Sequence, residues 1–215
     1  MKYGLCIFPT AYSIQPAELA VALEERGFES LWVAEHTHIP CSRETPWFGG
    51  GDLPQMYYDV YAPLVALAAA AAATTTLKVA TGVTLVAQHD PLILAKEVAT
   101  LDRVSNGRFM LGVGGGWNRE ELANHYDFPF ERRWKVMRER IEAMKTMWAE
   151  EKAAYHGEFV DFDEVFSSPK PGLLSTSDAA AEMQCVVPGR PASPKKKNHS
   201  TPRFRHAPTH HICHY

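Results

Sequence analysis

The chain has 215 residues, of which 46% are hydrophobic, 11% aromatic and 22% charged, and its formal net charge is −3. This composition excludes a wholly disordered chain and leaves enough apolar residues for a buried core. No apolar run reaches the length of about 18 residues typical of a spanning helix, so we expect no membrane partner. The scattered cysteines (Cys6, Cys41, Cys185 and Cys213) and the lack of a signal-peptide core favour a reducing, cytoplasmic setting.

The composition changes at Pro171. Residues 171–215 contain 6 Lys or Arg but 2 Asp or Glu, together with 6 of the 15 prolines and 5 of the 10 histidines. Their net charge is +4, which leaves −7 on the first 170 residues. Such a segment has few apolar side chains to offset its ordering entropy. We therefore expect a folded domain over residues 1–170 and a basic, Pro/His-rich tail of low order over residues 171–215.

The first half of the folded part is predicted to alternate strands and helices. Residues 2–8 form a short apolar strand, and a helix runs from Pro16 to Arg26, with Gly27 as its stop signal. Residues 30–35 form a second apolar strand, which is followed by a long loop rich in proline and glycine. The next helix is expected to open at Asp59 and to continue to about Thr74.

The same alternation continues in the second half. Residues 77–86 form a third strand, and Asp90-Pro91 supplies an N-cap and a first-turn proline for the helix behind it. Asn106-Gly107 predicts a tight turn into a fourth strand over residues 108–113. A long helix is expected over residues 131–151, followed by a short hairpin.

The long helix carries large apolar side chains at steps of three and four, which predict core packing rather than a cofactor site. They are Trp134, Met137, Ile141, Met144 and Trp148. The hairpin is centred near Gly157. Apolar strands alternating with helices are typical of α/β proteins with a parallel sheet and right-handed crossovers, and about four β/α units are present. Ligands in such folds bind at the carboxyl ends of the strands.

Polar side chains follow the carboxyl end of the second predicted strand. Glu35-His36-Thr37-His38 combines an acid with two histidines, and a histidine there suits proton transfer or a hydrogen bond to a heteroaromatic ring. The alternative is a loop histidine that binds a backbone carbonyl. A metal site is disfavoured, because His36 and His38 point to opposite sides of an extended segment.

Two glycine-containing segments also lie at carboxyl ends. Gly82 interrupts the third strand, which indicates either a bulge beside a flat ligand or close packing. The segment GVGGGW, residues 112–117, fails the GxGxxG dinucleotide pattern because Trp117 occupies the third glycine position. It remains a glycine-rich turn whose amides can approach an anion or a ring, or an exit loop without a ligand.

Two features of the tail carry little functional signal. Its histidines and cysteine are explained as well by a random basic sequence as by zinc binding, so we expect no metal. They are His206, His210, His211, Cys213 and His214. The short run of lysines at 195–197 lacks interleaved aromatic residues, so we expect no nucleic-acid partner.

Taken in order, these loops resemble the bacterial-luciferase-like family, and most closely its branch that uses the deazaflavin coenzyme F420, sometimes FMN. The segments that carry the resemblance, from residue 2 to about 170, are WVAEHTHIP, VATGVTLV, VSNGRFMLGVGGGW and FPFERRWKVMRERIEAMKTMW. The resemblance implies a (β/α)8 TIM barrel of an oxidoreductase or monooxygenase, with the flavin at the carboxyl end. A small organic substrate is then the expected partner, and a homodimer is one assembly that it allows.

The resemblance also implies roles for individual positions. His36 matches a catalytic histidine beside the flavin ring, and Gly82-Val83 matches a bulge, often a non-prolyl cis peptide, that backs the ring. The full cofactor-binding set implied is Glu35, His36, Gly82, Val83, Thr84, Gly114, Gly115, Gly116 and Trp117, with Glu120 in the same stretch. Some F420 dehydrogenases have a catalytic glutamate where Trp117 stands, which argues against a sugar-phosphate dehydrogenase.

The resemblance ends near Pro171, where family members continue with further barrel strands. Four β/α units are half of what closes the barrel. We therefore expect a truncated oxidoreductase of weak or absent activity on its own. The alternatives are a non-catalytic flavin-binding remnant, a subunit that completes its barrel with a partner, or an unrelated α/β binding protein. Hydride transfer and oxygen insertion are not distinguished, and neither are F420 and FMN.

Overall fold

The central sheet has the strand order β5-β3-β2-β1-β9 in the computed structural model, which describes residues 2–172 and 211–214. Its four parallel strands are β1 (Tyr3–Ile7), β2 (Ser30–Val33), β3 (Lys78–Thr81) and β5 (Phe109–Met110). One register row places Leu5, Leu31, Val79 and Phe109 side by side. Leu31, Val79 and Phe109 are buried, and Leu5 packs against the same apolar cluster, so this row joins the sheet to its helices.

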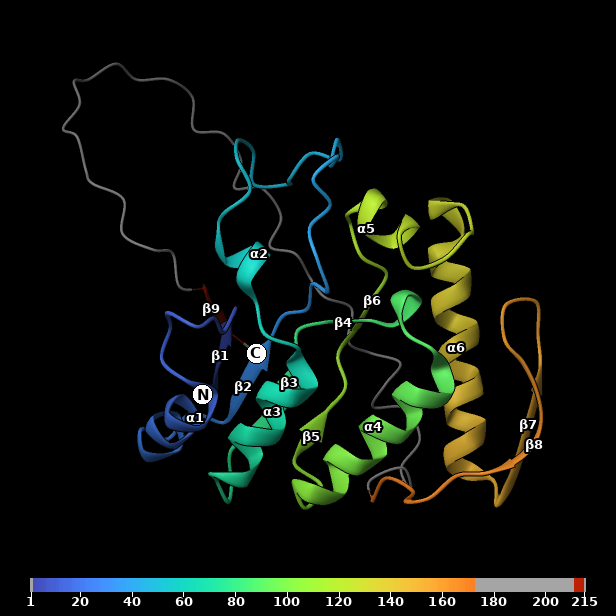
Figure 1. Cartoon of the computed structure of the whole chain (residues 1–215). Coiled ribbons are helices and arrows are strands. Elements are labelled where there is room, and N and C mark those ends of the chain that lie inside the picture. The colour runs from blue at the N-terminus through green and yellow to red at the C-terminus, as the bar shows by residue number, and fades with distance from the viewer. Residues whose placement is uncertain (1, 173–210, 215) are drawn as a thin grey trace.

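Helices cover one face of this sheet in the order in which they occur along the chain (Figure 1). They are α1 (Pro16–Glu25), α3 (Pro63–Ala72), α4 (Pro91–Val104) and α6 (Arg133–Ala149), with the short α2 (Met56–Asp59) and α5 (Arg119–Ala123) near the carboxyl ends of the strands. The parallel β/α architecture predicted from the alternation is confirmed.

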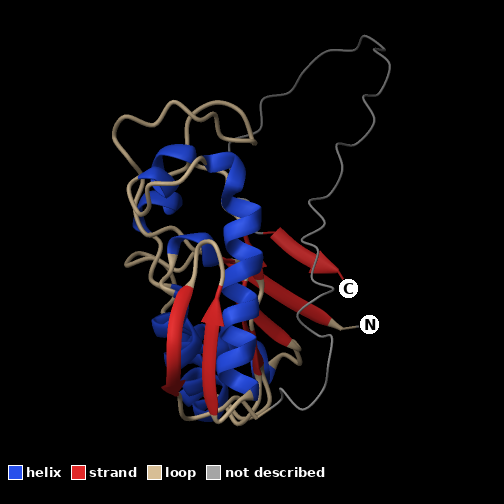
Figure 2. Cartoon of the chain, turned by 90° about the vertical axis from the view of Figure 1, so that its right-hand side faces the viewer, coloured by secondary structure: helices blue, strands red, loops and turns tan. Residues whose placement is uncertain are grey.

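Several local predictions are confirmed. Asp90 caps α4, because its carboxylate accepts hydrogen bonds from Leu92 N and Ile93 N. Asn106 and Gly107 form the predicted turn with φ of 55° and 74°. The predicted hairpin is β7 (Lys152–His156) and β8 (Asp161–Phe166), which lies along α6 (Figure 2).

The helix expected to open at Asp59 is a wrong prediction. Asp59 ends α2, and α3 begins four residues later at Pro63. Ala62 has ψ of 120°, which is outside the helical range. A proline disfavours helical geometry at the residue before it, so Pro63 separates the two helices.

The third and fourth predicted strands are each divided in two. The chain leaves the main sheet after Thr81 and after Met110, and β4 (Thr84–Leu85) then pairs with β6 (Val113–Gly114). Thr81 Oγ1 donates to Gly112 O at 2.8 Å and accepts from Gly112 N at 3.0 Å. A Cβ on Gly112 would lie 2.1 Å from Thr81 O, so only glycine allows the two segments to approach this closely.

The apolar positions of α6 form core contacts as predicted, with one exception. Met144 and Trp148 are buried, and Met137 and Ile141 pack against the same cluster. Trp134 is 50% exposed and is not a core residue.

The expected tail falls mostly outside the described residues. Its described parts are residues 171–172 and the backbone of β9 (His211–His214), which pairs antiparallel with β1. The side chains of residues 173–215, including those considered for zinc, lie outside the description. Within the described part, no group of histidine, cysteine and acidic residues is arranged to hold a metal, and no helix has the length and hydropathy to cross a bilayer.

Glu24 ties the end of α1 to the segment that enters β3. Its carboxylate accepts hydrogen bonds from the backbone amides of Thr75, Thr76 and Leu77 and from the Thr76 hydroxyl. The bonds from Thr76 and its neighbours outweigh partial burial and lower the pKa of Glu24 to about 2, from 4.5. The ionised carboxylate therefore stabilises the folded state.

We expect Glu24→Gln to lower the free energy of unfolding near neutral pH by about 1 kcal/mol. Because the folded pKa is depressed, this contribution is present above pH 4.5 and is lost as the pH falls toward about 2. Denaturant unfolding of both proteins between these values measures the difference. A difference that stays constant with pH would contradict the assignment. Glu25→Gln, on the same helix, is the control.

Candidate functional site

The loops at the carboxyl ends of the parallel strands meet, as the sheet topology predicts. The His36 ring lies 5.8 Å from the Trp117 ring and 5.3 Å from the Tyr57 ring, measured between centroids. Thr84 N donates to Gly112 O at 2.7 Å, which joins the loops after β3 and β5. Residues from four separate segments therefore form one site.

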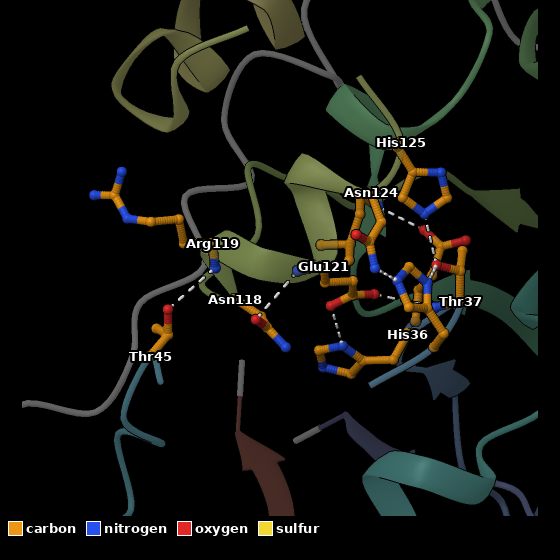
Figure 3. Close-up of polar contacts among 11 residues, drawn as sticks. His36, Thr37, Thr45, Asn118, Arg119, Glu121, Asn124 and His125 are labelled. Atoms are coloured by element: carbon orange, nitrogen blue, oxygen red, sulfur yellow. Dashed lines mark hydrogen bonds and ion pairs between the residues drawn. The ribbon is translucent and has the colours of Figure 1, made fainter. Parts of the chain in front are cut away.

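His36 is held by a buried carboxylate that the sequence analysis did not single out. His36 Nδ1 lies 2.8 Å from Glu121 Oε2, and Thr37 N donates to Glu121 Oε1 at 3.1 Å (Figure 3). The side chain of Glu121 is 1% exposed and that of His36 is 6% exposed. A carboxylate only accepts, so Nδ1 is the donor, and Nε2 is the nitrogen that can exchange a proton with a bound molecule.

The first turn of α5 places Glu121. Asn118 caps this helix, and its Oδ1 accepts from Glu121 N at 3.3 Å. The sequence carries a signal for this arrangement, because Asn118-x-x-Glu121 has the spacing of a capping box. The glutamate side chain does not reach back to its own cap, however, and binds the loop after β2 instead. The spacing of residues in the sequence does not predict this long-range contact.

Glu35, expected to bind the cofactor, is buried and binds two groups of the protein itself. Its Oε2 accepts from Leu85 N at 2.6 Å, and its Oε1 lies 2.8 Å from His89 Nε2. Burial alone would lower the pKa of His89, but the hydrogen bond and charge of Glu35 outweigh it, and the pKa of His89 is raised. Glu35 therefore holds the strand segment β4 in place.

The Gly82–Val83 peptide bond is cis, as the family resemblance implies. Gly82 and Val83 are partly exposed, whereas Thr84 is fully buried. A Cβ on Gly82 would meet Trp32 at 3.3 Å, so the close-packing alternative accounts for part of this glycine's role. The backbone of Gly82 and Val83 is the part of this segment that a flat ligand can reach.

The glycine-rich segment lies beside this peptide. A Cβ on Gly114 would lie 2.5 Å from Val83 Cγ2, and one on Gly115 would lie 2.9 Å from the Trp134 ring. Gly116 has φ of 73°. Gly114, Gly116 and Trp117 are partly exposed and Gly115 is buried. Close packing accounts for the presence of glycine at these positions. It also leaves backbone without side chains next to Val83.

A flavin or deazaflavin ring fits the residues present. Buried side-chain atoms without a hydrogen-bond partner include Thr10 Oγ1, Thr84 Oγ1, Gln88 Oε1 and Asn118 Nδ2. Thr10 and Asn118 lie in loops that follow β1 and β6, and Thr84 and Gln88 lie in and just after β4. Unpaired buried polar atoms are rare except where a ligand or water completes them. The residues that would border the ring are His36, Gly82, Val83, Gly114, Gly116 and Trp117.

Comparison with known proteins decides the family. The family described as luciferase-like monooxygenase matches residues 14–187, which include the site and most of the described fold. The chain belongs to this family. The match continues past Pro171, where the resemblance noted in the sequence ends.

Individual relatives add detail. An uncharacterised protein of Mycobacterium tuberculosis is 45% identical over 80% of this chain and 61% of its own length. An F420-dependent glucose-6-phosphate dehydrogenase of Kineococcus radiotolerans is 31% identical over 72% of this chain and 43% of its own length. The crystal structure of monooxygenase RslO1 from Streptomyces bottropensis superimposes with a TM-score of 0.65 at 28% identity, covering 79% of this chain and 50% of that one.

Structures of the same fold have also been solved with FMN and with an F420–acetone adduct, at 22% and 24% identity, which shows the fold alone. The chain spans about half the length of the characterised relatives and solved structures that it matches. The partial (β/α)8 barrel expected from the sequence agrees with this coverage.

Proposed function

We propose that the chain contributes the ring-binding and proton-transferring part of an F420- or FMN-dependent oxidoreductase that acts on a small organic molecule in the cytoplasm. The observation that carries the proposal is the buried His36–Glu121 pair, which follows Glu35 in the chain. Glu35 binds Leu85 N, two residues after the partly exposed Gly82–Val83 backbone, so the two segments are joined. Family membership and an F420-dependent relative support the cofactor class. Hydride transfer and oxygen insertion both remain compatible with these residues.

The bound cofactor would supply the redox chemistry. The chain's own residues orient the ring and handle a proton. Glu121 fixes the plane of the His36 imidazole and keeps Nδ1 as a donor. Nε2 is then the nitrogen that can exchange a proton with the bound molecule. Glu35 positions the Val83 segment through Leu85 N. Trp117 and Tyr57 exclude water from two sides of His36.

Titration of the purified chain with FMN and with F420 tests the proposal. We expect micromolar binding of one of them, seen as quenching of cofactor fluorescence. His36→Ala should weaken binding and, in a preparation that turns over, reduce the rate at least about 100-fold. His156→Ala is the matched control, since His156 lies on the exposed hairpin. Absence of binding for both cofactors would reject the proposal.

The alternative is a chain that binds the cofactor but needs a partner to turn over. In the described residues the main sheet has four parallel strands, fewer than the eight that close a (β/α)8 barrel, and this favours it. The same titration separates the two: binding with turnover by the monomer supports a self-sufficient enzyme and overturns the truncation hypothesis. Binding without turnover, restored when a second chain is added, supports the alternative.

A further inference from the structure

The loop between β2 and α2 brings two aromatic side chains to the rim of the site. Phe48 lies 6.4 Å from Trp117, and Trp47 lies 6.0 Å from Tyr57, measured between ring centroids. Trp117 and Tyr57 also contact the His36 ring. We call Trp47, Phe48, Tyr57 and Trp117 the aromatic wall. The wall therefore borders His36 on the sides of Tyr57 and Trp117.

The wall is held in position by polar bonds. Glu120 accepts from Glu44 N and Thr45 N, each at 3.0 Å, and from Thr45 Oγ1 at 2.7 Å. Trp47 Nε1 donates to Tyr57 Oη at 3.2 Å. Phe48 nevertheless remains 74% exposed. A large apolar ring kept exposed on an anchored loop beside a site indicates a surface that binds an apolar ligand.

The polar groups around the wall already have partners within the protein, which disfavours a phosphate. The neighbouring amides of Glu44 and Thr45 already bind the Glu120 carboxylate, and partial burial of that group is outweighed by these bonds, so the pKa of Glu120 is lowered. Its negative charge offsets the positive charge of Arg43, which lies over Trp117. The two nearby arginines have partners of their own. Arg43 lies over Trp117 and donates to Thr45 O, and Arg119 pairs with Glu131 at 2.7 Å.

We propose that the aromatic wall is the substrate-contacting surface of this chain and that it selects uncharged, apolar organic molecules over phosphorylated ones. This inference rests on the proposed function and names its substrate class. The rings supply apolar contact, and the carboxylate of Glu120 anchors the wall and occupies the two amides that could otherwise bind a phosphate. Phe48 is the residue whose loss removes contact without disturbing the core.

The test uses the full chain loaded with the cofactor that it binds. Saturation-transfer NMR measures binding of two probes, menadione as a flat apolar carbonyl compound and glucose 6-phosphate as a phosphorylated one. We expect menadione to bind and glucose 6-phosphate to bind at least about tenfold more weakly. Phe48→Ala should weaken menadione binding about fivefold. Phe166→Ala is the control, because Phe166 is 73% exposed on β8.

The outcomes are distinguishable. If the wild-type chain binds neither cofactor, the proposed function fails, and this inference fails with it. If the cofactor binds but menadione does not, or glucose 6-phosphate binds as tightly, the inference alone is overturned. Equal effects of Phe48→Ala and Phe166→Ala also overturn it. As a second measurement, Glu120→Ala should speed hydrogen exchange at the Glu44 and Thr45 amides, and unchanged exchange would reject the anchoring role.

Discussion

Replacing Glu121 with alanine is expected to lower the free energy of unfolding by about 3 kcal/mol, because it removes the acceptor of one buried and one partly buried donor. These donors are His36 Nδ1 and Thr37 N, which the carboxylate binds at 2.8 and 3.1 Å. The carboxylate is 1% exposed, so water does not replace it without rearrangement. Denaturant unfolding of the full chain measures the loss. Glu164→Ala, on the exposed face of β8, should change stability by less than about 0.5 kcal/mol.

Glu121→Gln separates the stabilising role from the chemical one. The glutamine oxygen can still accept from Thr37 N, so we expect a smaller loss of stability than with alanine. Its amide nitrogen then faces His36 and donates to Nδ1, which moves the imidazole proton to Nε2. Nitrogen NMR of the histidine ring reports this change of tautomer. We expect turnover to fall with glutamine as much as with alanine. A glutamine variant with the wild-type tautomer would show that Glu121 has only a structural role.

The predictions made from the sequence were accurate where a local pattern decides the structure. Asp90 before Pro91, and Asn106 before Gly107, specify a cap and a turn through bonds within a few residues, and both are present. Apolar strands alternating with helices likewise predicted the parallel sheet. Where two signals competed, as at Asp59 and Pro63, the proline decided the boundary.

The polar groups that complete the site could not be predicted in the same way. His36 was identified from its place after a strand, but its partner Glu121 is 85 residues away. Glu35 was assigned to the cofactor, and its contacts with Leu85 N and His89 appear only after the chain folds. The Glu120 contacts with Glu44 and Thr45 are equally distant in sequence. Pairings of this kind depend on how the loops meet in the folded chain. The local spacing of residues does not predict these contacts.

Replacing Arg108 with alanine is expected to destabilise the opposite end of the sheet from the site. The guanidinium donates to four backbone carbonyls and one hydroxyl. The acceptors are Ala71 O, Thr74 O, Thr74 Oγ1, Leu77 O and Ser105 O. Ala71 lies in the last turn of α3, Ser105 caps the end of α4, and Leu77 precedes β3. One cation therefore binds the carboxyl-terminal ends of two helices, where its charge also complements the helix dipoles.

We expect Arg108→Ala to cost about 3 kcal/mol and to lower the melting temperature by about 10 °C, since charged hydrogen bonds to partly buried carbonyls are lost together. Arg108→Lys should recover less than half of this loss, because an ammonium group cannot reach acceptors in so many directions. Arg138→Ala, at an exposed position of α6, is the control and should change little. Cofactor affinity at the carboxyl ends should be unaffected below the melting transition. A loss of affinity in folded Arg108→Ala would show that the two ends of the sheet are coupled.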